Sequence, residues 1–332
     1  MIDRSGIQFT EAPNVDDGRG RDADAPTEIP ARGWWDIAWR CWHGIQQDRL
    51  LLIAAGATFY LLLALFPALA AFVSVYGFVA DPTTIADHIA FLGGVLPTGG
   101  YELIRGQLAA LASQDQSALS WGFVTGLAVA LWSANNGVKT LFEGLNIAYG
   151  EQEKRSFLRL HAVSFAFTFG AILIGVALIG FVGVAPAVLA LFPFGRLTEI
   201  AVSVARWPLL LVLTGFGIAI LFRYGPSRER PKWRWITPGA AVATLVWLAA
   251  SIGFSIYLQN FADYNATYGS LGAVIGFMMW TWISVIVLLI GAEINAEMEH
   301  QTARDSTTGA PLPMGQRGAV VADSVGESVA GA

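Results

Sequence analysis

The sequence predicts an all-α polytopic membrane protein with six transmembrane helices. Three observations predict this class: 55% of the 332 residues are hydrophobic, only 14% are charged, and six apolar runs are long enough to cross a bilayer. Ordinary soluble domains carry about 25% charged residues, and a helix needs about 20 residues to span the hydrocarbon. Because a soluble fold has too little interior to bury so much apolar surface, we expect a chain that folds within a lipid bilayer.

The two ends of the chain differ from this central part. Residues 1–32 are rich in acidic and basic side chains and lack the apolar stretch that a secretory signal needs. Residues 299–332 are rich in Gly, Ala, Ser and Thr and show no periodicity. We therefore expect two disordered cytoplasmic tails, which flank a transmembrane domain at residues 33–298.

The segment 33–49 has the pattern of an amphipathic helix. Trp34, Trp35 and Trp39 fall on one helical face, and Asp36 and Arg40 fall on the other. A tryptophan-rich face beside a basic flank is typical of a helix that lies in the plane of the membrane interface. The sequence therefore predicts an N-terminal interfacial helix before the first span.

Six apolar runs then follow in order. Pro67 lies inside the first run and is expected to kink that helix without ending it. The fourth run is the weakest, because Arg206 and Pro208 stand at its start and Arg223 follows it. The stretch 83–113 is broken by Gly and Pro pairs, which favours short extracytoplasmic helices over another span. The predicted spans are residues 50–79, 119–141, 162–191, 208–222, 236–258 and 271–292.

Lys and Arg residues predict how the chain is oriented. They concentrate before the first span, between the second and third spans, and between the fourth and fifth spans. The opposite side carries only Arg105, Arg196 and Arg206. Because basic residues accumulate in cytoplasmic loops, both termini are expected in the cytoplasm.

Composition and motifs exclude several classes of activity. The net charge of −5 offers no basic surface for nucleic acid, and the single cysteine excludes an intrachain disulfide. No nucleophile elbow, Walker A motif or H-E-x-x-H motif is present. A zinc nuclease needs clustered ligands, whereas the histidines stand apart. We therefore expect no enzyme activity, no catalytic residue, no metal, no cofactor and no nucleic-acid partner. The four histidines are His43, His88, His161 and His300.

Polar residues near the membrane are functional candidates, because burying them there is costly. Lys139 and Glu293 are expected at similar depth on the cytoplasmic side, so an ion pair between them is sterically feasible. Interfacial snorkelling and hydrogen bonds between helices are the structural alternatives. On the outer side, the hairpin between the last two spans is either structural or part of a substrate path. The candidate path or gate residues are Asn135, Asn136, Lys139, Glu143, Asn260, Asp263, Asn265, Tyr268, Glu293 and Asn295.

The loop between the fourth and fifth spans is basic. Its simplest role is as an orientation signal that also attracts anionic lipids. The sharper alternative is a specific site for a lipid headgroup. The headgroup candidates are Arg223, Arg228, Arg230, Lys232 and Arg234.

Several blocks of the sequence resemble the YihY/BrkB family of bacterial inner-membrane proteins. They are ATFYLLLALFP at 57–67, LWSANNGV at 131–138, YLQNFADYNATYGSLG at 257–272 and GAEIN at 291–295. The resemblance covers roughly residues 33–298. It implies six helices in the bacterial inner membrane and does not imply a settled biochemical activity. Members have been called virulence factors and transporters and were mislabelled ribonuclease BN, an activity that the scattered histidines argue against.

The main functional hypothesis is a transporter or flippase-like handler of a lipid or another amphipathic envelope substrate. Membrane lipids are the expected partners, and self-association into a homo-oligomer is also considered. The alternative is a scaffold of the cell envelope that transports nothing. A transporter needs a continuous polar cavity between helices, whereas a scaffold needs only a packed bundle.

Overall fold

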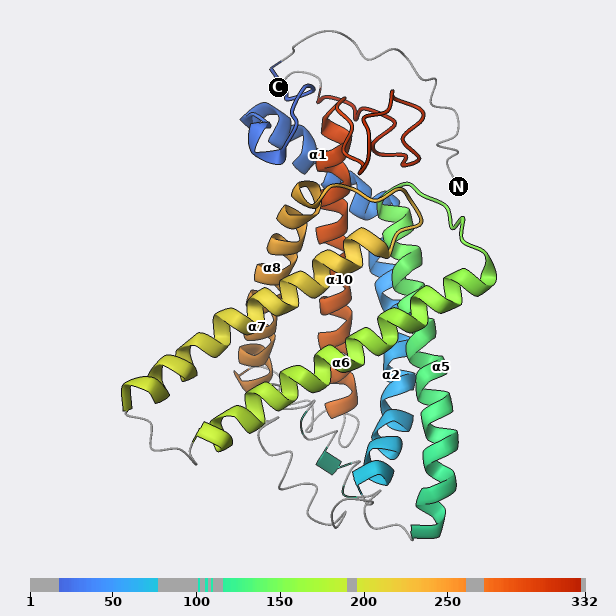
Figure 1. Cartoon of the computed structure of the whole chain (residues 1–332), viewed down its shortest axis with the longest axis vertical. Coiled ribbons are helices and arrows are strands. Elements are labelled where there is room, and N and C mark those ends of the chain that lie inside the picture. Colours follow the sequence, from blue (N-terminus) through green and yellow to red (C-terminus); the bar gives the residue numbers. More distant parts are fainter. Residues whose placement is uncertain are drawn as a thin grey trace.

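The chain folds into long helices, most of which run roughly along the long axis of the molecule while the others cross them obliquely (Figure 1). This arrangement is seen in a computed structural model that describes residues 18–76, 116–189, 196–260 and 272–329, together with Tyr101, Arg105, Gly106 and Ala109. Within those residues the elements are η2 (Pro26–Glu28), α1 (Ala31–Gln47), α2 (Leu50–Tyr76), α5 (Gln116–Ala148), α6 (Phe157–Leu189), α7 (Arg196–Tyr224), α8 (Trp233–Asn260) and α10 (Gly272–Gln301).

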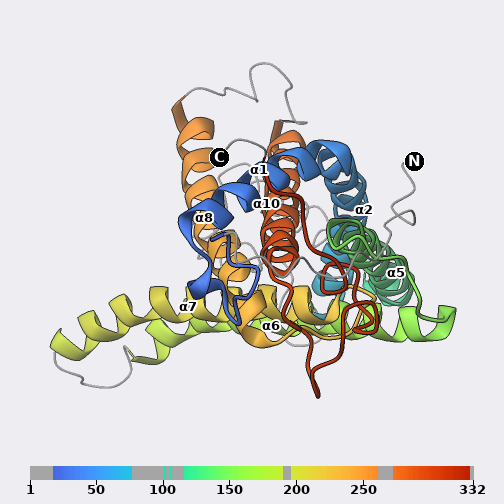
Figure 2. The same cartoon turned by 90° about the horizontal axis from the view of Figure 1, so that it is seen from above.

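Helix α10 is the centre of the bundle and contacts α1, α2, α5 and α8. Helices α6 and α7 run side by side across one flank of that group (Figures 1 and 2). Small residues allow the close packing: a Cβ atom on Gly291 would lie 2.7 Å from the Cβ of Ala243, and one on Gly144 would lie 2.8 Å from Leu289. Glycine at such positions lets helix backbones approach closely.

The helical class is confirmed, and each of the six predicted apolar runs falls largely within one of the helices α2, α5, α6, α7, α8 and α10. Helix α2 continues past Pro67, as predicted. By length and composition, four segments in the described ranges are able to cross a membrane: Leu50–Ala68, Phe157–Ile174, Trp233–Leu258 and Val274–Gln301. A count of six spans stays a prediction, and the short helices predicted at 83–113 fall almost entirely outside the described residues.

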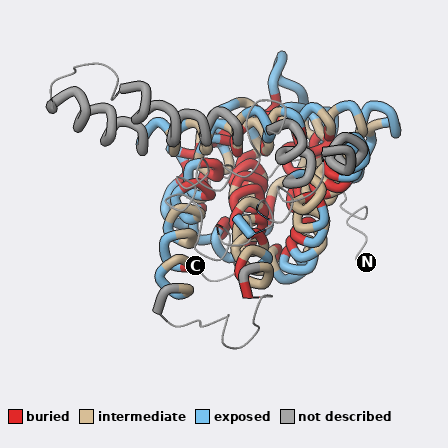
Figure 3. Tube along the Cα trace, turned by 90° about the horizontal axis from the view of Figure 1, so that it is seen from below, coloured by how far each residue is buried: buried red, intermediate tan, exposed pale blue. Residues whose placement is uncertain are grey.

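The outer surface of the helices is apolar. Leu52, Leu173, Val212 and Leu245 are each more than 60% exposed. In water such large aliphatic side chains would be buried, whereas lipid solvates them without cost. In Figure 3 many of the exposed positions line the outside of the bundle, and buried positions concentrate on its central helices. This distribution suits an integral membrane protein.

At one end of the bundle the chain forms a layer that we name the polar cap. It consists of residues 18–47, 149–156, 225–232 and 302–329 (Figure 1, top). Its C-terminal part differs from the disordered tail expected for residues 299–332. Ala319 and Ala322 are buried, and residues 299–301 are the end of α10.

Side-chain hydrogen bonds to the backbone hold this irregular segment together. Arg317 is 6% exposed and donates to the carbonyl oxygens of four residues. The N-terminal segment is held similarly, because Gln301 donates to the Arg19 carbonyl and Thr302 to the Ala23 carbonyl. Residues 18–32 are therefore also ordered, whereas residues 1–17 lie outside the described part. The acceptors of Arg317 are the carbonyls of Ala303, Arg304, Leu312 and Ala322.

Candidate functional site

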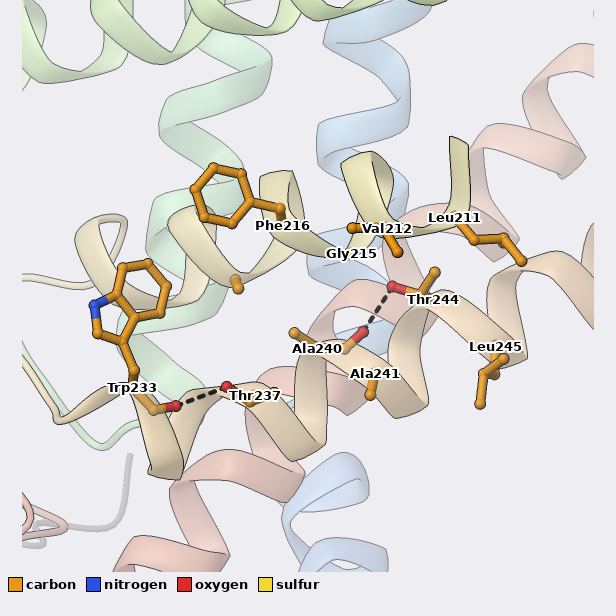
Figure 4. Close-up of a pocket in the computed structure, with 11 residues that line it drawn as sticks. Leu211, Val212, Gly215, Phe216, Trp233, Thr237, Ala240, Ala241, Thr244 and Leu245 are labelled. Carbon is orange, nitrogen blue, oxygen red and sulfur yellow. Dashed lines mark hydrogen bonds between the residues drawn. The ribbon is translucent and has the colours of Figure 1, made fainter. Parts of the chain in front are cut away.

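A groove of about 470 Å³ lies between α7 and α8 (Figure 4). It is lined almost entirely by apolar side chains from these two helices. Val212, Phe216 and Leu245 are more than half exposed, so the groove opens on the outer surface of the bundle. An acyl chain of a surrounding lipid can therefore enter it from the side. Its lining includes Val212, Gly215, Phe216, Trp233, Ala241 and Thr244.

Two threonines in the groove do not make it polar. The hydroxyl of Thr237 donates to the carbonyl of Trp233 at 2.9 Å, and that of Thr244 donates to the carbonyl of Ala240 at 2.7 Å (Figure 4). Such bonds to the preceding turn satisfy the hydroxyl within its own helix. On α7, a Cβ atom at Gly215 would lie 3.1 Å from the Thr244 hydroxyl oxygen. Glycine there allows α7 and α8 to approach closely along the floor of the groove.

Aromatic rings line one end of the groove, and two arginines lie over aromatic rings near that end without lining it. The rings of Phe216 and Trp233 stack with centroids 6.2 Å apart and planes at 14°. The guanidinium carbon of Arg223 lies 4.6 Å from the centroid of Trp233, and that of Arg230 lies 5.1 Å from the ring of Tyr224. Cations over aromatic faces are attracted by about 0.5–2 kcal/mol each. Apolar length with positive charge at one end matches the shape of a lipid with an anionic headgroup.

The five basic headgroup candidates separate into two groups. Arg230 and Arg234 are exposed at the end of α8 that carries Trp233. Lys232 is half-buried and donates to the carbonyl of Asp305 at 2.7 Å. Arg223 is 9% exposed and donates to the carbonyl of Pro231. Arg228 is buried inside the cap, which does not suit a contact with a headgroup.

Arg228 forms a two-point ion pair with Glu299 at the end of α10. The distances are 3.1 Å from Nη1 to Oε1 and 2.6 Å from Nη2 to Oε2, and both side chains are at most 1% exposed. The guanidinium also lies 4.8 Å from the ring centroid of Tyr149, and Ser306 donates to Glu299 at 2.7 Å. Burial alone would lower the pKa of Arg228, but the Glu299 carboxylate raises it above its ordinary value. This group locks the cap to α10.

The candidates on α5 have contacts within α5 and with α6. Lys139 Nζ lies 3.4 Å from Nε2 of His161 on α6, and Glu143 is exposed. Asn135 is 1% exposed, and its side-chain oxygen has no hydrogen-bond partner among the described residues. The backbone carbonyl of Asn136 accepts from Thr140.

The candidates on α10 bind neighbouring helices. A Cβ atom on Gly44 of α1 would lie 2.0 Å from Oε1 of Glu293, so this carboxylate packs directly against α1. Oδ1 of Asn295 accepts from the backbone N–H of Gly239 on α8 at 2.8 Å. Lys139 and Glu293 thus have different neighbours, and these polar residues join pairs of helices at separate points. Of the outer candidates, Asn260 is the last residue of α8, while Asp263, Asn265 and Tyr268 lie outside the described residues.

The histidines have separate local partners. In the described ranges, no group of three or more His, Cys, Asp or Glu side chains is arranged to hold a metal ion. His43 bonds the Trp39 carbonyl, and His300 lies 3.1 Å from Ser324. His88 lies outside the described residues.

Sequence reasoning missed the groove, although a signal was present. Thr237, Ala240, Ala241 and Thr244 follow one another at the spacing of a single helical face, and all are small. A stripe of small residues predicts close helix contact. Its partner, α7, could not be identified from the sequence.

Comparisons with known proteins agree with these observations. The family model described as Virulence factor BrkB matches residues 41–313. The ribonuclease-like protein YfkH of Bacillus subtilis is 30% identical over 73% of this chain and 88% of its own length. A UPF0761 membrane protein of Pseudoalteromonas translucida is 24% identical over 82% of this chain and 88% of its own length. A UPF0761 membrane protein of Alteromonas mediterranea is 26% identical over 76% of this chain and 84% of its own length. No solved structure shows a significant match. The chain therefore belongs to the BrkB family of membrane proteins.

Proposed function

We propose that this protein crosses the bacterial inner membrane several times, has both termini in the cytoplasm, and binds and moves a membrane lipid through the groove between α7 and α8. The observation that carries the proposal is the groove itself, which is lined by apolar side chains and has Phe216 and Trp233 at one end, with Arg223 over the Trp233 ring. No catalytic residue is needed for this function.

The groove suits an acyl chain in size and chemistry. Its volume of about 470 Å³ falls within the range of roughly 300–1,000 Å³ that is usual for ligand sites. Each methylene buried from water contributes about 0.8 kcal/mol, but a lipid already lies in hydrocarbon. Contacts with the groove therefore position the acyl chain but add little binding free energy. Discrimination among lipids depends on the headgroup.

The headgroup would bind at the end of the groove where α8 begins. Arg230 and Arg234 are exposed there beside Trp233, which is 42% exposed. Basic residues near an anionic membrane surface contribute about 1 kcal/mol each, and tryptophan favours the level of the headgroups. The basic loop belongs in the cytoplasm by the same rule that orients the chain, so the proposed substrate is an anionic lipid of the inner leaflet.

A bulky side chain in the groove tests the proposal. Ala241 is exposed and lines the groove, so Ala241→Trp is expected to fill it without disturbing the core. Ala249→Trp is the matched control, because Ala249 is an exposed alanine of the same helix outside the lining. The purified proteins are compared by native mass spectrometry for retained phospholipid, and in proteoliposomes for translocation of a fluorescent phosphatidylglycerol.

The expected result is that the wild type and Ala249→Trp retain and translocate the lipid, whereas Ala241→Trp loses both activities. Equal lipid retention by the two variants would refute the groove as the binding site. Retention without translocation by the wild type would refute transport. It would favour the scaffold hypothesis.

A further inference from the structure

Four of the exposed residues of α1 are tryptophans. Trp34 and Trp39 are each 39% exposed, Trp35 is 60% exposed and Trp42 is 64% exposed. Large aromatic side chains gathered on one exposed face indicate a binding surface. The sequence predicts that this helix lies at the membrane interface, which requires that the rest of the protein leaves the tryptophan face uncovered.

The polar face of α1 is the one that packs against the protein. Asp36 is fully buried and bonds Arg19 at 2.7 Å. Arg40 is 8% exposed, pairs with Glu297 and donates to the side-chain oxygen of Gln301 at 2.7 Å. The helix cannot rotate to bury its tryptophans without breaking these buried ion pairs, and losing one partner of such a pair costs about 3–5 kcal/mol.

Charges on the outward side of α1 suit phosphate groups. In residues 31–49, Arg32 and Arg49 are exposed, whereas the carboxylates of Asp36 and Asp48 are buried and half-buried. The two arginines lie at opposite ends of the tryptophan face. Arginine binds phosphate oxygens through paired N–H groups, so cations at both ends and aromatic rings between them complement the headgroup layer of a phospholipid bilayer.

The tryptophan face also continues into a surface that lipid covers. The chain turns at Arg49, which has a φ of +52°, and enters α2 directly. Leu51 and Leu52, at the start of that apolar helix, are 49% and 67% exposed. Figure 2 shows α1 running across the end of the bundle to reach α2. The C-terminal end of α1 therefore lies beside the start of α2, and tryptophans next to the start of an apolar helix are typical of aromatic belts.

We infer that the face formed by Trp34, Trp35, Trp39 and Trp42 docks on the boundary between headgroups and acyl chains of the same membrane. Its partner is the phospholipid bilayer itself. This contact holds the polar cap at a fixed height above the hydrocarbon, and it is independent of whether the groove between α7 and α8 binds lipid.

Spin labels at three depths test the inference in the full-length protein. The native Cys41 is 7% exposed and is kept, and wild-type protein serves as the control for background labelling. Trp42→Cys reports the proposed interface, Leu52→Cys reports the hydrocarbon, and Leu312→Cys, 44% exposed in the cap, reports water. Each variant is reconstituted into vesicles of phosphatidylethanolamine and phosphatidylglycerol, and its accessibility to oxygen and to a nickel chelate is measured.

The expected oxygen-to-nickel accessibility ratio at Trp42→Cys lies between a high value at Leu52→Cys and a low value at Leu312→Cys. A ratio equal to that of Leu312→Cys would overturn the inference, because the face would then be in water. Low accessibility to both reagents would also overturn it, because a protein surface would then cover the face. Thermal unfolding close to that of the wild type shows that each variant is folded.

Discussion

Removal of one charge from the Arg228–Glu299 pair should loosen the polar cap. In the Glu299→Gln variant, the side-chain oxygen can still accept from Ser306, but the counter-charge of Arg228 is lost. Both side chains of the pair are at most 1% exposed, so water cannot replace the missing interaction without opening the cap. The Tyr149 ring at 4.8 Å offers the guanidinium only a weak substitute.

The expected loss in the free energy of unfolding follows from the burial of the Arg228–Glu299 pair. Breaking a buried ion pair from one side costs about 3–5 kcal/mol, because the remaining charge stays buried without its partner. Replacing both members by apolar residues costs less, since no buried charge remains. The double variant Arg228→Met, Glu299→Leu is therefore expected to be more stable than either single variant, with a coupling energy of about 2 kcal/mol or more.

Equilibrium unfolding in mixed micelles of dodecyl maltoside and dodecyl sulfate measures these differences. Glu229→Gln is the matched control, because Glu229 is an exposed acid next to Arg228, and such changes usually stay within about 0.5 kcal/mol. If Glu299→Gln and Glu229→Gln cost the same, or if the double variant costs the sum of the single variants, the pair is hydrated and the reasoning fails.

Two further predictions concern α1 and the loop after α5. Gly44→Ala should destabilise the protein by about 1–3 kcal/mol, because its Cβ atom would lie 2.0 Å from the Glu293 carboxylate. Gly56→Ala, whose Cβ atom would lie 3.6 Å from the Thr140 side chain, should be nearly neutral in the same unfolding measurement, and equal effects would contradict this packing. Burial alone would raise the pKa of Glu153, but hydrogen bonds from Arg155 hold it at about 2. Because this pKa is lowered on folding, the stabilisation is complete above about pH 4.5 and is lost as the pH falls toward 2. The difference in midpoint temperature between the wild type and Glu153→Gln should therefore shrink from pH 5 to pH 3, and a constant difference would show that the carboxylate is not held this way.

The apolar helices could be predicted from the sequence because hydrocarbon imposes a simple composition on whatever crosses it. Their ends could not. Helices α5 and α10 continue to Ala148 and Gln301, well beyond their apolar runs, because polar residues there find partners in the cap. The apolar composition of a segment identifies where its contact with lipid ends, whereas the helix itself ends where its backbone hydrogen bonds end.

The cap was missed for a related reason. Its C-terminal part has no helical or strand periodicity and is held by contacts such as Arg40 to the Glu327 carbonyl, 287 positions apart in the sequence. Both faces of α1 were visible in the sequence, but the sequence does not show that buried ion pairs with Arg19 and Glu297 hold its polar face. The groove depends on which helices are neighbours, and that pairing is equally absent from local patterns. Arg228 was identified as a candidate by its charge, yet only the fold shows that it is paired with the buried carboxylate of Glu299.

The uninterrupted course of α10 has a mechanical consequence. Its 30 residues, at about 1.5 Å each, give a length of roughly 45 Å, against about 30 Å of hydrocarbon. Its last residues reach the cap, where Glu297 pairs with Arg40 and Glu299 pairs with Arg228. Helix α10 is continuous from the lipid-facing bundle to the cap, so the two parts are expected to move together. Any tilt of α10 among its lipid-facing neighbours is transmitted to the cap as a sideways displacement.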